Sequence, residues 1–191
     1  MSPSENISSD LFGPLAALAG TWEGDEGLDV SFSNQLGNMI DTPYRERTTL
    51  SPFGPVENGT QTLYGLDYRM AAWRGEEENP FHTEVGYWLW DAADRQVLRS
   101  FTIPRGSAIL AGGTASAEDT TFTMAAAAGS ETYGILSNRF LAAQARCIAY
   151  EVTVTVAEDG SFAYDETSTI EHQRNGSLVI HTDRNVMRRV D

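Results

Sequence analysis

The chain has 191 residues, of which 41% are hydrophobic, and its 27 acidic residues against 13 Lys and Arg give a formal net charge of −14. This length falls within the range of one domain with a substantial hydrophobic core. The negative charge argues against nucleic acids and anionic membranes as partners, because their phosphates would be repelled.

Compartment signals in the sequence point to the cytoplasm. Cys147 is the one cysteine, so no intramolecular disulfide can form, which is typical of a reducing compartment. Residues 1–10 are polar and acidic, without the basic and apolar regions of a secretory signal, and we expect a flexible tail there. Apolar runs are too short to span a bilayer. We therefore expect a cytoplasmic protein with one domain over residues 11–191.

The first third of the chain changes from a helical to a strand pattern. Residues 11–20 form one short apolar segment that ends at Gly20, typical of a short helix or turn. After Gly20 the hydrophobic period becomes two, which is typical of β-strands. The expected elements are a glycine-interrupted strand or strand pair over 21–33, an irregular insertion over 34–43, a strand over 44–51 and a turn over 52–59.

The rest of the chain continues as strands joined by short polar turns. Asp159-Gly160 and Asn175-Gly176 are hairpin signals between the last three strands. A short helix or a loop over the barrel mouth is expected within 129–145. The expected strands span 60–73, 81–90, 96–104, 107–115, 120–128, 146–157, 162–172 and 178–190.

About ten sequential strands predict an all-β fold. An antiparallel up-and-down barrel of the calycin or lipocalin type is favoured, because closure removes exposed strand edges. A barrel of this size can enclose one small ligand. The alternative is a two-sheet sandwich, whose crossover connections a sequence does not reveal directly.

The segment Gly20-Thr21-Trp22 has a structural interpretation. A tryptophan that opens the first strand can plug the closed end of a barrel, and Gly20 allows a tight turn into that strand. Arg188 or Arg189 of the last strand is expected to lie over the indole ring. This motif supports the fold and not an activity.

Two histidines are candidates for ligand binding. His82 shares strand parity with Trp88 and Trp90, and it either faces a pocket or is a hydrogen-bonded structural residue. His181 is followed at strand spacing by Asp183, and this face either lines a wet cavity or meets solvent. If it faces inward, His181 is the best candidate for an axial iron ligand or a general base.

Other motifs carry less functional weight. His172 lies beside a turn and is expected to be exposed. The sequence has no His-x-x-x-His or Cys-x-x-Cys, so a zinc site is not expected. No residue is assigned a catalytic role.

Three separated segments resemble the nitrobindin family of heme-binding β-barrels, also described as fatty-acid-binding-protein-like or lipocalin-like. They are "LAGTWEGDEG" (18–27), "FHTEVGYW" (81–88) and "HTDRNVMRRV" (181–190). The resemblance implies a ten-stranded barrel that holds ferric heme b, with His181 as the iron ligand and His82 lining the pocket. Family members are linked to nitric oxide binding and to isomerisation of peroxynitrite to nitrate.

The sequence departs from the family pattern in two places. The last-strand histidine of heme-binding members stands in an apolar run, whereas His181 is followed by Thr182, Asp183, Arg184 and Asn185. The segments 34–43 and 129–145 are additional to a compact member and could cap or fill the pocket. The fold therefore carries over better than the cofactor does.

The first functional hypothesis is heme binding. His181 would ligate the iron, with its other ring nitrogen oriented by Asp183 or a backbone carbonyl. Met70, Trp88 and Met187 would pack against the porphyrin. If the protein is an enzyme, the resemblance implies a heme-dependent peroxynitrite isomerase.

Two alternatives do not involve iron. One is a heme-free intracellular carrier of a small lipid-like or apolar acid ligand, in which His82, Glu84 or His181 orients the polar end. The aromatic walls of that carrier would be Tyr64, Tyr68, Trp88 and Trp90. The other is a barrel filled by its own side chains, which acts through its surface.

Overall fold

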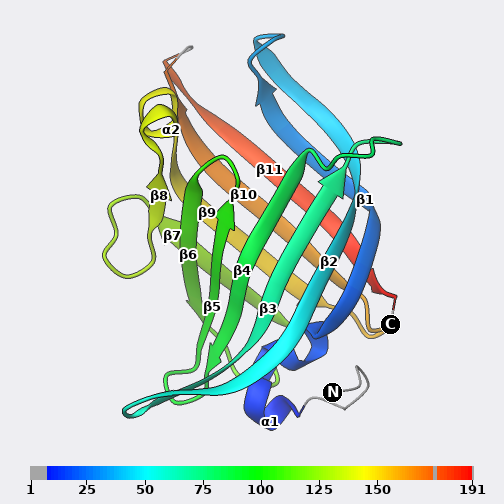
Figure 1. Cartoon of the computed structure of the whole chain (residues 1–191), viewed down its shortest axis with the longest axis vertical. Coiled ribbons are helices and arrows are strands. Elements are labelled where there is room, and N and C mark those ends of the chain that lie inside the picture. Colours follow the sequence, from blue (N-terminus) through cyan, green and yellow to red (C-terminus); the bar gives the residue numbers. More distant parts are fainter. Residues whose placement is uncertain (1–7, 174–175, 191) are drawn as a thin grey trace.

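The computed structural model describes residues 8–173 and 176–190. Ten antiparallel strands close into a barrel, and an eleventh short strand extends the sheet (Figure 1). The strands are β1 (Gly20–Ser33), β2 (Asn38–Asn58), β3 (Gln61–Trp73), β4 (His82–Asp91), β5 (Gln96–Ile103), β6 (Ser107–Thr114), β7 (Thr121–Ala127), β8 (Ile135–Ser137), β9 (Ala145–Val156), β10 (Phe162–His172) and β11 (Ser177–Arg189).

The strand order follows the sequence, as an up-and-down barrel requires. Each long strand pairs with its sequence neighbours, and β1 pairs with β11 to close the ring. Strand β7 pairs with β9 because β8 and the helix α2 (Arg139–Gln144) form an excursion beside β6. The predicted barrel is therefore confirmed, and a two-sheet sandwich is excluded. Within the described residues, no helix has the length and hydrophobicity to cross a membrane.

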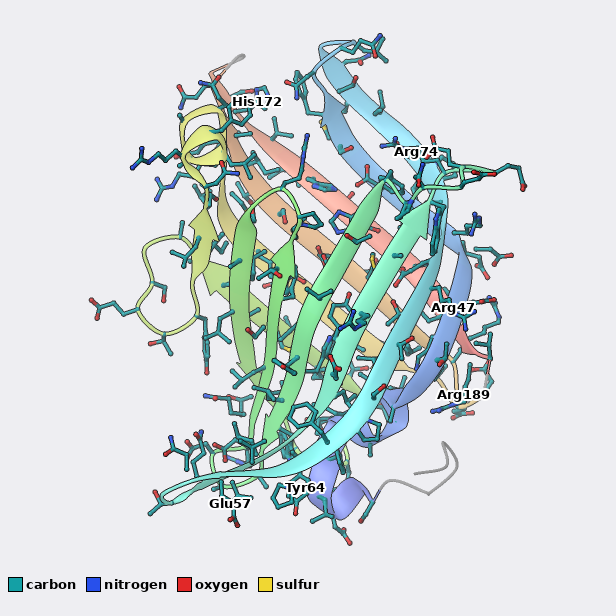
Figure 2. All side chains as sticks on the ribbon, viewed as in Figure 1. Arg47, Glu57, Tyr64, Arg74, His172 and Arg189 are labelled. Atoms are coloured by element: carbon teal, nitrogen blue, oxygen red, sulfur yellow. The ribbon has the colours of Figure 1, made fainter. Side chains whose placement is uncertain are left out.

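The N-terminal segment plugs one end of the barrel. Helix α1 (Ser9–Phe12) and the 3-10 helix η1 (Gly13–Leu18) lie beneath the strands there, and Leu15, Leu18 and Trp22 are fully buried. The indole Nε1 of Trp22 donates to the carbonyl oxygen of Leu18 at 2.7 Å. Figure 2 labels Arg189 near this end of the barrel. Its guanidinium lies 4.5 Å from the ring centroid of Trp22, which confirms the predicted cation–π contact.

Strand β1 matches its predicted range of 21–33 to within one residue, whereas β2 is longer than the sequence pattern predicts. The irregular insertion expected over 34–43 is wrong, because β1 runs to Ser33 and β2 begins at Asn38 after a short turn. The turn expected over 52–59 is also wrong, because β2 continues to Asn58. Pro55 lies where the register with β3 shifts, between Phe53 and Val56. A proline is tolerated at such an irregularity because the ladder lacks a hydrogen bond there.

The barrel interior divides into an apolar half and a polar half. The plugged half is filled by buried apolar side chains, including Leu50, Leu66, Val97, Met124 and Val154. Above them lies a layer of buried ionisable and hydroxyl side chains, which includes Glu46, Glu84 and Arg99. Of the short helix or loop expected within 129–145, the structure has the helix, α2, which contributes Leu141 to the cavity lining at the other end of the barrel.

Candidate functional site

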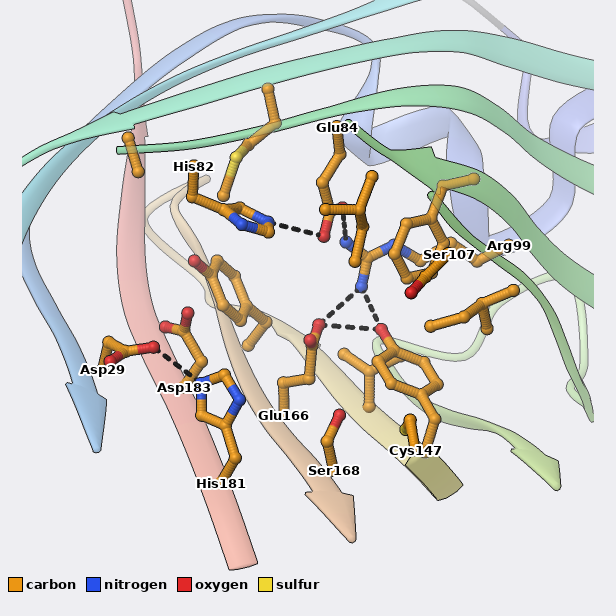
Figure 3. Close-up of a pocket in the computed structure, with 18 of the residues that line it drawn as sticks. Asp29, His82, Glu84, Arg99, Ser107, Cys147, Glu166, Ser168, His181 and Asp183 are labelled. Carbon is orange, nitrogen blue, oxygen red and sulfur yellow. Dashed lines mark hydrogen bonds and ion pairs between the residues drawn. The ribbon is translucent and has the colours of Figure 1, made fainter. Parts of the chain in front are cut away.

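A cavity of about 250 Å³ occupies the upper half of the barrel, above the plug. Its apolar lining includes Leu50, Met70, Phe81, Trp88, Phe101, Ile103, Ile109, Leu141, Val152 and Ile170. Its polar lining includes Asp29, Glu46, Tyr68, His82, Glu84, Arg99, Tyr150, Tyr164, Glu166, Ser168, His181 and Asp183 (Figure 3). The cavity therefore combines an apolar wall with a dense set of ionisable groups.

Arg99 of β5 is the centre of the polar layer. Its guanidinium donates to Glu84 at 2.6 Å, to Glu166 at 2.8 Å and to the Tyr68 hydroxyl at 3.0 Å. Burial alone would lower the pKa of Arg99, but the oxygens of its tyrosine and glutamate neighbours hold that pKa well above its ordinary value. Arg99 is thus a permanent cation in the middle of the barrel, held between two carboxylates.

His82 of β4 extends this network toward the mouth. Its Nε2 lies 3.1 Å from Oε1 of Glu84, and the imidazole is half-buried. Burial would lower the pKa of His82, but the hydrogen bond to Glu84 and the charge of Glu84 raise it. Burial would raise the pKa of Glu84, but Arg99 and His82 together hold it below its ordinary value. Glu84 therefore stays ionised between two cationic partners.

Tyr44 and Tyr164 connect a second cluster of polar side chains beneath β11. The hydroxyls of Tyr44 and Tyr164 are 2.7 Å apart; Tyr44 donates to Asp183, and Tyr164 donates to Glu46 at 2.6 Å. Burial, together with the negative charge of Glu166, raises the pKa of Asp183 to about 8. Burial likewise raises the pKa of Glu46. These two carboxyl groups therefore retain protons to a higher pH than an exposed acid does.

His181 of β11 faces the cavity and is anchored by an aspartate of β1. Its Nε2 lies 2.6 Å from Oδ2 of Asp29, whose Oδ1 accepts a 2.6 Å hydrogen bond from Ser31 (Figure 3). Burial would lower the pKa of His181, but the hydrogen bond and charge of Asp29 raise it. Burial would raise the pKa of Asp29, but His181 and Ser31 lower it. The two side chains form a hydrogen-bonded pair at one wall of the cavity, and this pair is an ion pair when His181 is protonated.

The described cavity lining holds an excess of acid groups. Below the rim, the groups that can carry a positive charge are Arg99, His82 and His181, and Arg105 lies at the exposed rim. Its carboxyl groups are Asp29, Glu46, Glu84, Glu166 and Asp183. Five acids against three cationic groups leave two carboxyl groups without a cationic partner inside the barrel.

The structure brings together four of the five residues that the sequence predicts for heme binding. His82, Met70 and Trp88 line the cavity on β3 and β4, and His181 lines it on β11. Met187 is fully buried near Gly24 and does not line the cavity. The inner face of β11, which the sequence left open, carries both His181 and Asp183.

Some of the residues expected to surround these five lie elsewhere in the structure. Asp29, and not Asp183, hydrogen-bonds the ring of His181. Of the aromatic residues expected for a carrier, Tyr68 and Trp88 line the cavity, whereas Tyr64 stacks edge-on against Phe12 and Trp90 is buried beside Gly13.

The prediction that His172 is exposed is wrong. His172 is buried, and its Nε2 lies 3.2 Å from Oδ1 of Asn34 in the turn after β1. Figure 2 shows it at the end of the barrel that carries α2. The ring also packs against Phe32, with 4.7 Å between the centroids. A residue from a distant turn therefore covers a histidine that its own sequence neighbours would leave in water.

Sequence reasoning missed the acidic floor of the cavity. The inward-facing positions of β1, β2 and β10 include Asp29, Glu46 and Glu166. An acid among the apolar residues of an inward face is a signal of a polar interior. Arg99 stands between Val97 and Phe101 at the same parity, and a lone arginine on an apolar face indicates a buried partner.

Comparison with known proteins agrees with this architecture. The model of the family described as "THAP4-like, heme-binding beta-barrel domain" matches residues 11–189. Among solved structures, the crystal structure of Rv2717c from M. tuberculosis superposes with a TM-score of 0.64 at 18% sequence identity, and the match covers 95% of this chain and 100% of that one. No curated protein matches the chain.

Proposed function

Because the chain belongs to the THAP4-like, heme-binding β-barrel family, also called the nitrobindin family, we propose that its cavity binds ferric heme b through His181. One observation carries this proposal: His181 of the last strand faces the cavity with its imidazole oriented by a carboxylate. Histidines that ligate metals commonly have their second ring nitrogen bonded in this way, which raises the basicity of the ligand. Since Asp29 engages Nε2, Nδ1 would be the nitrogen that faces the iron.

The chemistry of the cavity fits a heme. His82 lies on the wall opposite His181, and Met70, Phe81 and Ile103 offer apolar surface to a porphyrin. The cavity of about 250 Å³ is slightly smaller than pockets that enclose a drug-sized ligand, about 300–1,000 Å³. A heme would therefore not be enclosed completely by the cavity.

The proposed reactivity is nitric oxide binding. When bound, ferric heme supplies an open coordination position for a diatomic ligand. The Nε2 of His82 contacts Glu84, and the position of this imidazole across from His181 suits hydrogen bonding to such a ligand. The carboxyl groups around the cavity favour the neutral nitric oxide over the peroxynitrite anion, so we place isomerisation of peroxynitrite second.

The charge of the cavity bears on the alternative, a heme-free carrier of an apolar acid. The carboxylate of such a ligand would need Arg99, and Arg99 already holds Glu84 and Glu166 at 2.6 and 2.8 Å. Further acids around it would repel a negative ligand. A carrier role is therefore supported for a neutral or cationic ligand and not for an acid.

A hemin titration tests the proposal. We expect hemin to give a shifted Soret band with the wild-type protein, and His181→Ala to abolish that shift. The matched control is His172→Gln, because His172 does not line the cavity and its loss should leave the band unchanged. A free-hemin spectrum with the wild-type protein would overturn the proposal, as would an unchanged band in folded His181→Ala.

A further inference from the structure

Two aspartates face each other across the closing seam of the barrel. Asp29 of β1 and Asp183 of β11 are directly paired in the β-ladder, and both side chains line the cavity. If both carboxyl groups at such directly opposed positions were ionised, they would repel each other and destabilise the sheet. At most positions such a pair lies in water, whereas Asp29 is buried and Asp183 is half-buried. The arrangement is one that a cation between the two side chains would stabilise.

His181 completes this pair as a set of three ligands. It precedes Asp183 by two residues on β11, so both side chains lie on the same face of the strand. One ligand atom from each of Asp29, His181 and Asp183 lies within 4.8 Å of the other two. Ligand atoms about 2.1 Å from one ion are at most about 4.2 Å apart, so a small side-chain rotation would close the site.

We propose that Asp29, His181 and Asp183 bind a divalent first-row transition-metal ion directly, without a porphyrin. Two carboxylate oxygens and an imidazole nitrogen form a donor set that suits Zn²⁺, Co²⁺ and ions of similar size. All three ligands stand on paired strands, which hold them more rigidly than loops do. Three protein ligands leave coordination positions for water or a small ligand on the cavity side.

The surroundings of the three residues support a cation. Ser31 donates to the Oδ1 of Asp29 that His181 does not use, and Tyr44 donates to Asp183, so each carboxylate has an orienting partner. Two carboxyl groups of the described cavity lining, Glu46 and Asp183, lack a cationic partner inside the barrel. A divalent ion would displace the proton that Asp183 otherwise retains and would supply two positive charges. This inference does not rest on heme binding, because the ion would take Nε2 of His181 together with the two aspartates.

Sequence spacing could not show this site. Asp29 and His181 are 152 residues apart, and barrel closure alone brings them together. Metal motifs that can be read from a sequence depend on ligands close together along the chain. The absence of such a motif therefore does not bear on a site built across β1 and β11.

Cobalt binding to the full chain tests the proposal. After treatment with a chelator, we expect Co²⁺ to give visible absorption bands that saturate at one ion per chain, and Zn²⁺ to displace it. Changes outside the ligand sphere cost about 10–100-fold in metal affinity, so loss of a ligand in Asp183→Asn should weaken binding at least about 100-fold. The control Asp41→Asn removes an exposed acid of β2 and should bind as the wild type does.

Hemin separates this site from the proposed heme site. Asp183→Asn should lose cobalt and keep the shifted Soret band, whereas His181→Ala should lose both. Circular dichroism of each variant checks that the barrel is folded. Wild-type protein that binds cobalt no more tightly than Asp183→Asn would overturn the metal site, and this result would leave heme binding intact. Cobalt binding without any Soret shift would overturn the heme proposal alone.

Discussion

Arg99 and Glu84 form a buried ion pair, 2.6 Å between nitrogen and oxygen, on neighbouring strands at the floor of the cavity. Removal of one partner from a buried pair leaves an uncompensated charge. We expect Arg99→Met to lower the free energy of unfolding by about 3–5 kcal/mol, measured by urea denaturation.

Two further variants serve as controls for the prediction about Arg99→Met. Arg47→Met breaks an exposed pair with Glu23 and should cost less than about 1 kcal/mol. The double variant Arg99→Met with Glu84→Gln should recover part of the loss, because it removes the unpaired carboxylate as well. If Arg99→Met is as mild as Arg47→Met, the polar floor contributes little to stability.

The raised pKa of Asp183 predicts how the free energy of unfolding depends on pH. Its pKa in the fold is about 8, above the value of about 3.9 for an unfolded aspartate, so the folded chain binds more protons between these two values. The contribution of Asp183 to the free energy of unfolding is therefore greatest below pH 4 and is lost as the pH rises to about 8.

Chemical denaturation at several pH values in the presence of EDTA measures this contribution. We expect Asp183→Asn to unfold with a flatter pH profile than the wild type between pH 4 and 8, since asparagine does not titrate. As the pH rises, the free energy of unfolding of the variant should increase relative to that of the wild type. Parallel profiles for the two proteins would contradict the raised pKa.

The hydrogen bond that His181 donates to Asp29 predicts the pH dependence of heme affinity. A protonated imidazole cannot ligate iron, so the affinity for hemin should fall as the pH drops through the raised pKa of His181. Asp29→Asn removes the charge that raises this pKa and should shift the midpoint of the profile to lower pH. At pH 8 the variant should bind hemin about 10–100-fold more weakly, because the ligand loses its orienting partner. An unshifted midpoint would show that Asp29 does not control the imidazole.

The close approach of β5 explains why the segment shared with the family has a glycine at position 86. It pairs with Phe101 of β5, and a Cβ at this position would lie 1.9 Å from the backbone carbonyl oxygen of Ser100. Gly86→Ala should therefore force the strands apart and cost about 1–3 kcal/mol or more of unfolding free energy. Thermal unfolding measures the effect, and Val85→Ala on the exposed face of the same strand is the control. Equal melting temperatures for the two variants would contradict the prediction.

Most of the fold could be predicted from the sequence because period-two patterning and turn residues are local. Strand β10 matches its predicted range of 162–172, and the Trp22 plug with its arginine was also foreseen. The ends of β2 are not evident from the sequence, because strand residues that are exposed on both faces show no alternation.

The polar interior could be predicted only in part, because the residues that pair with each other there are distant in the chain. His181 and His82 were recognised by residue type, but their carboxylate partners depend on strand register. A register irregularity between β9 and β10 also places Cys147 in the cavity lining, where the simple alternation from Tyr150 would place Ile148. One irregular residue is enough to exchange the two faces of a strand.

The plug of Leu15, Leu18 and Trp22 has a kinetic consequence for whatever occupies the cavity. A barrel sealed at this end makes a ligand enter and leave by the same route, past the rim that carries Leu141 of α2. Substitutions at that rim should then change the association and dissociation rates together. The rim therefore governs how fast a ligand exchanges, whereas the groups deeper in the cavity govern how tightly it is held.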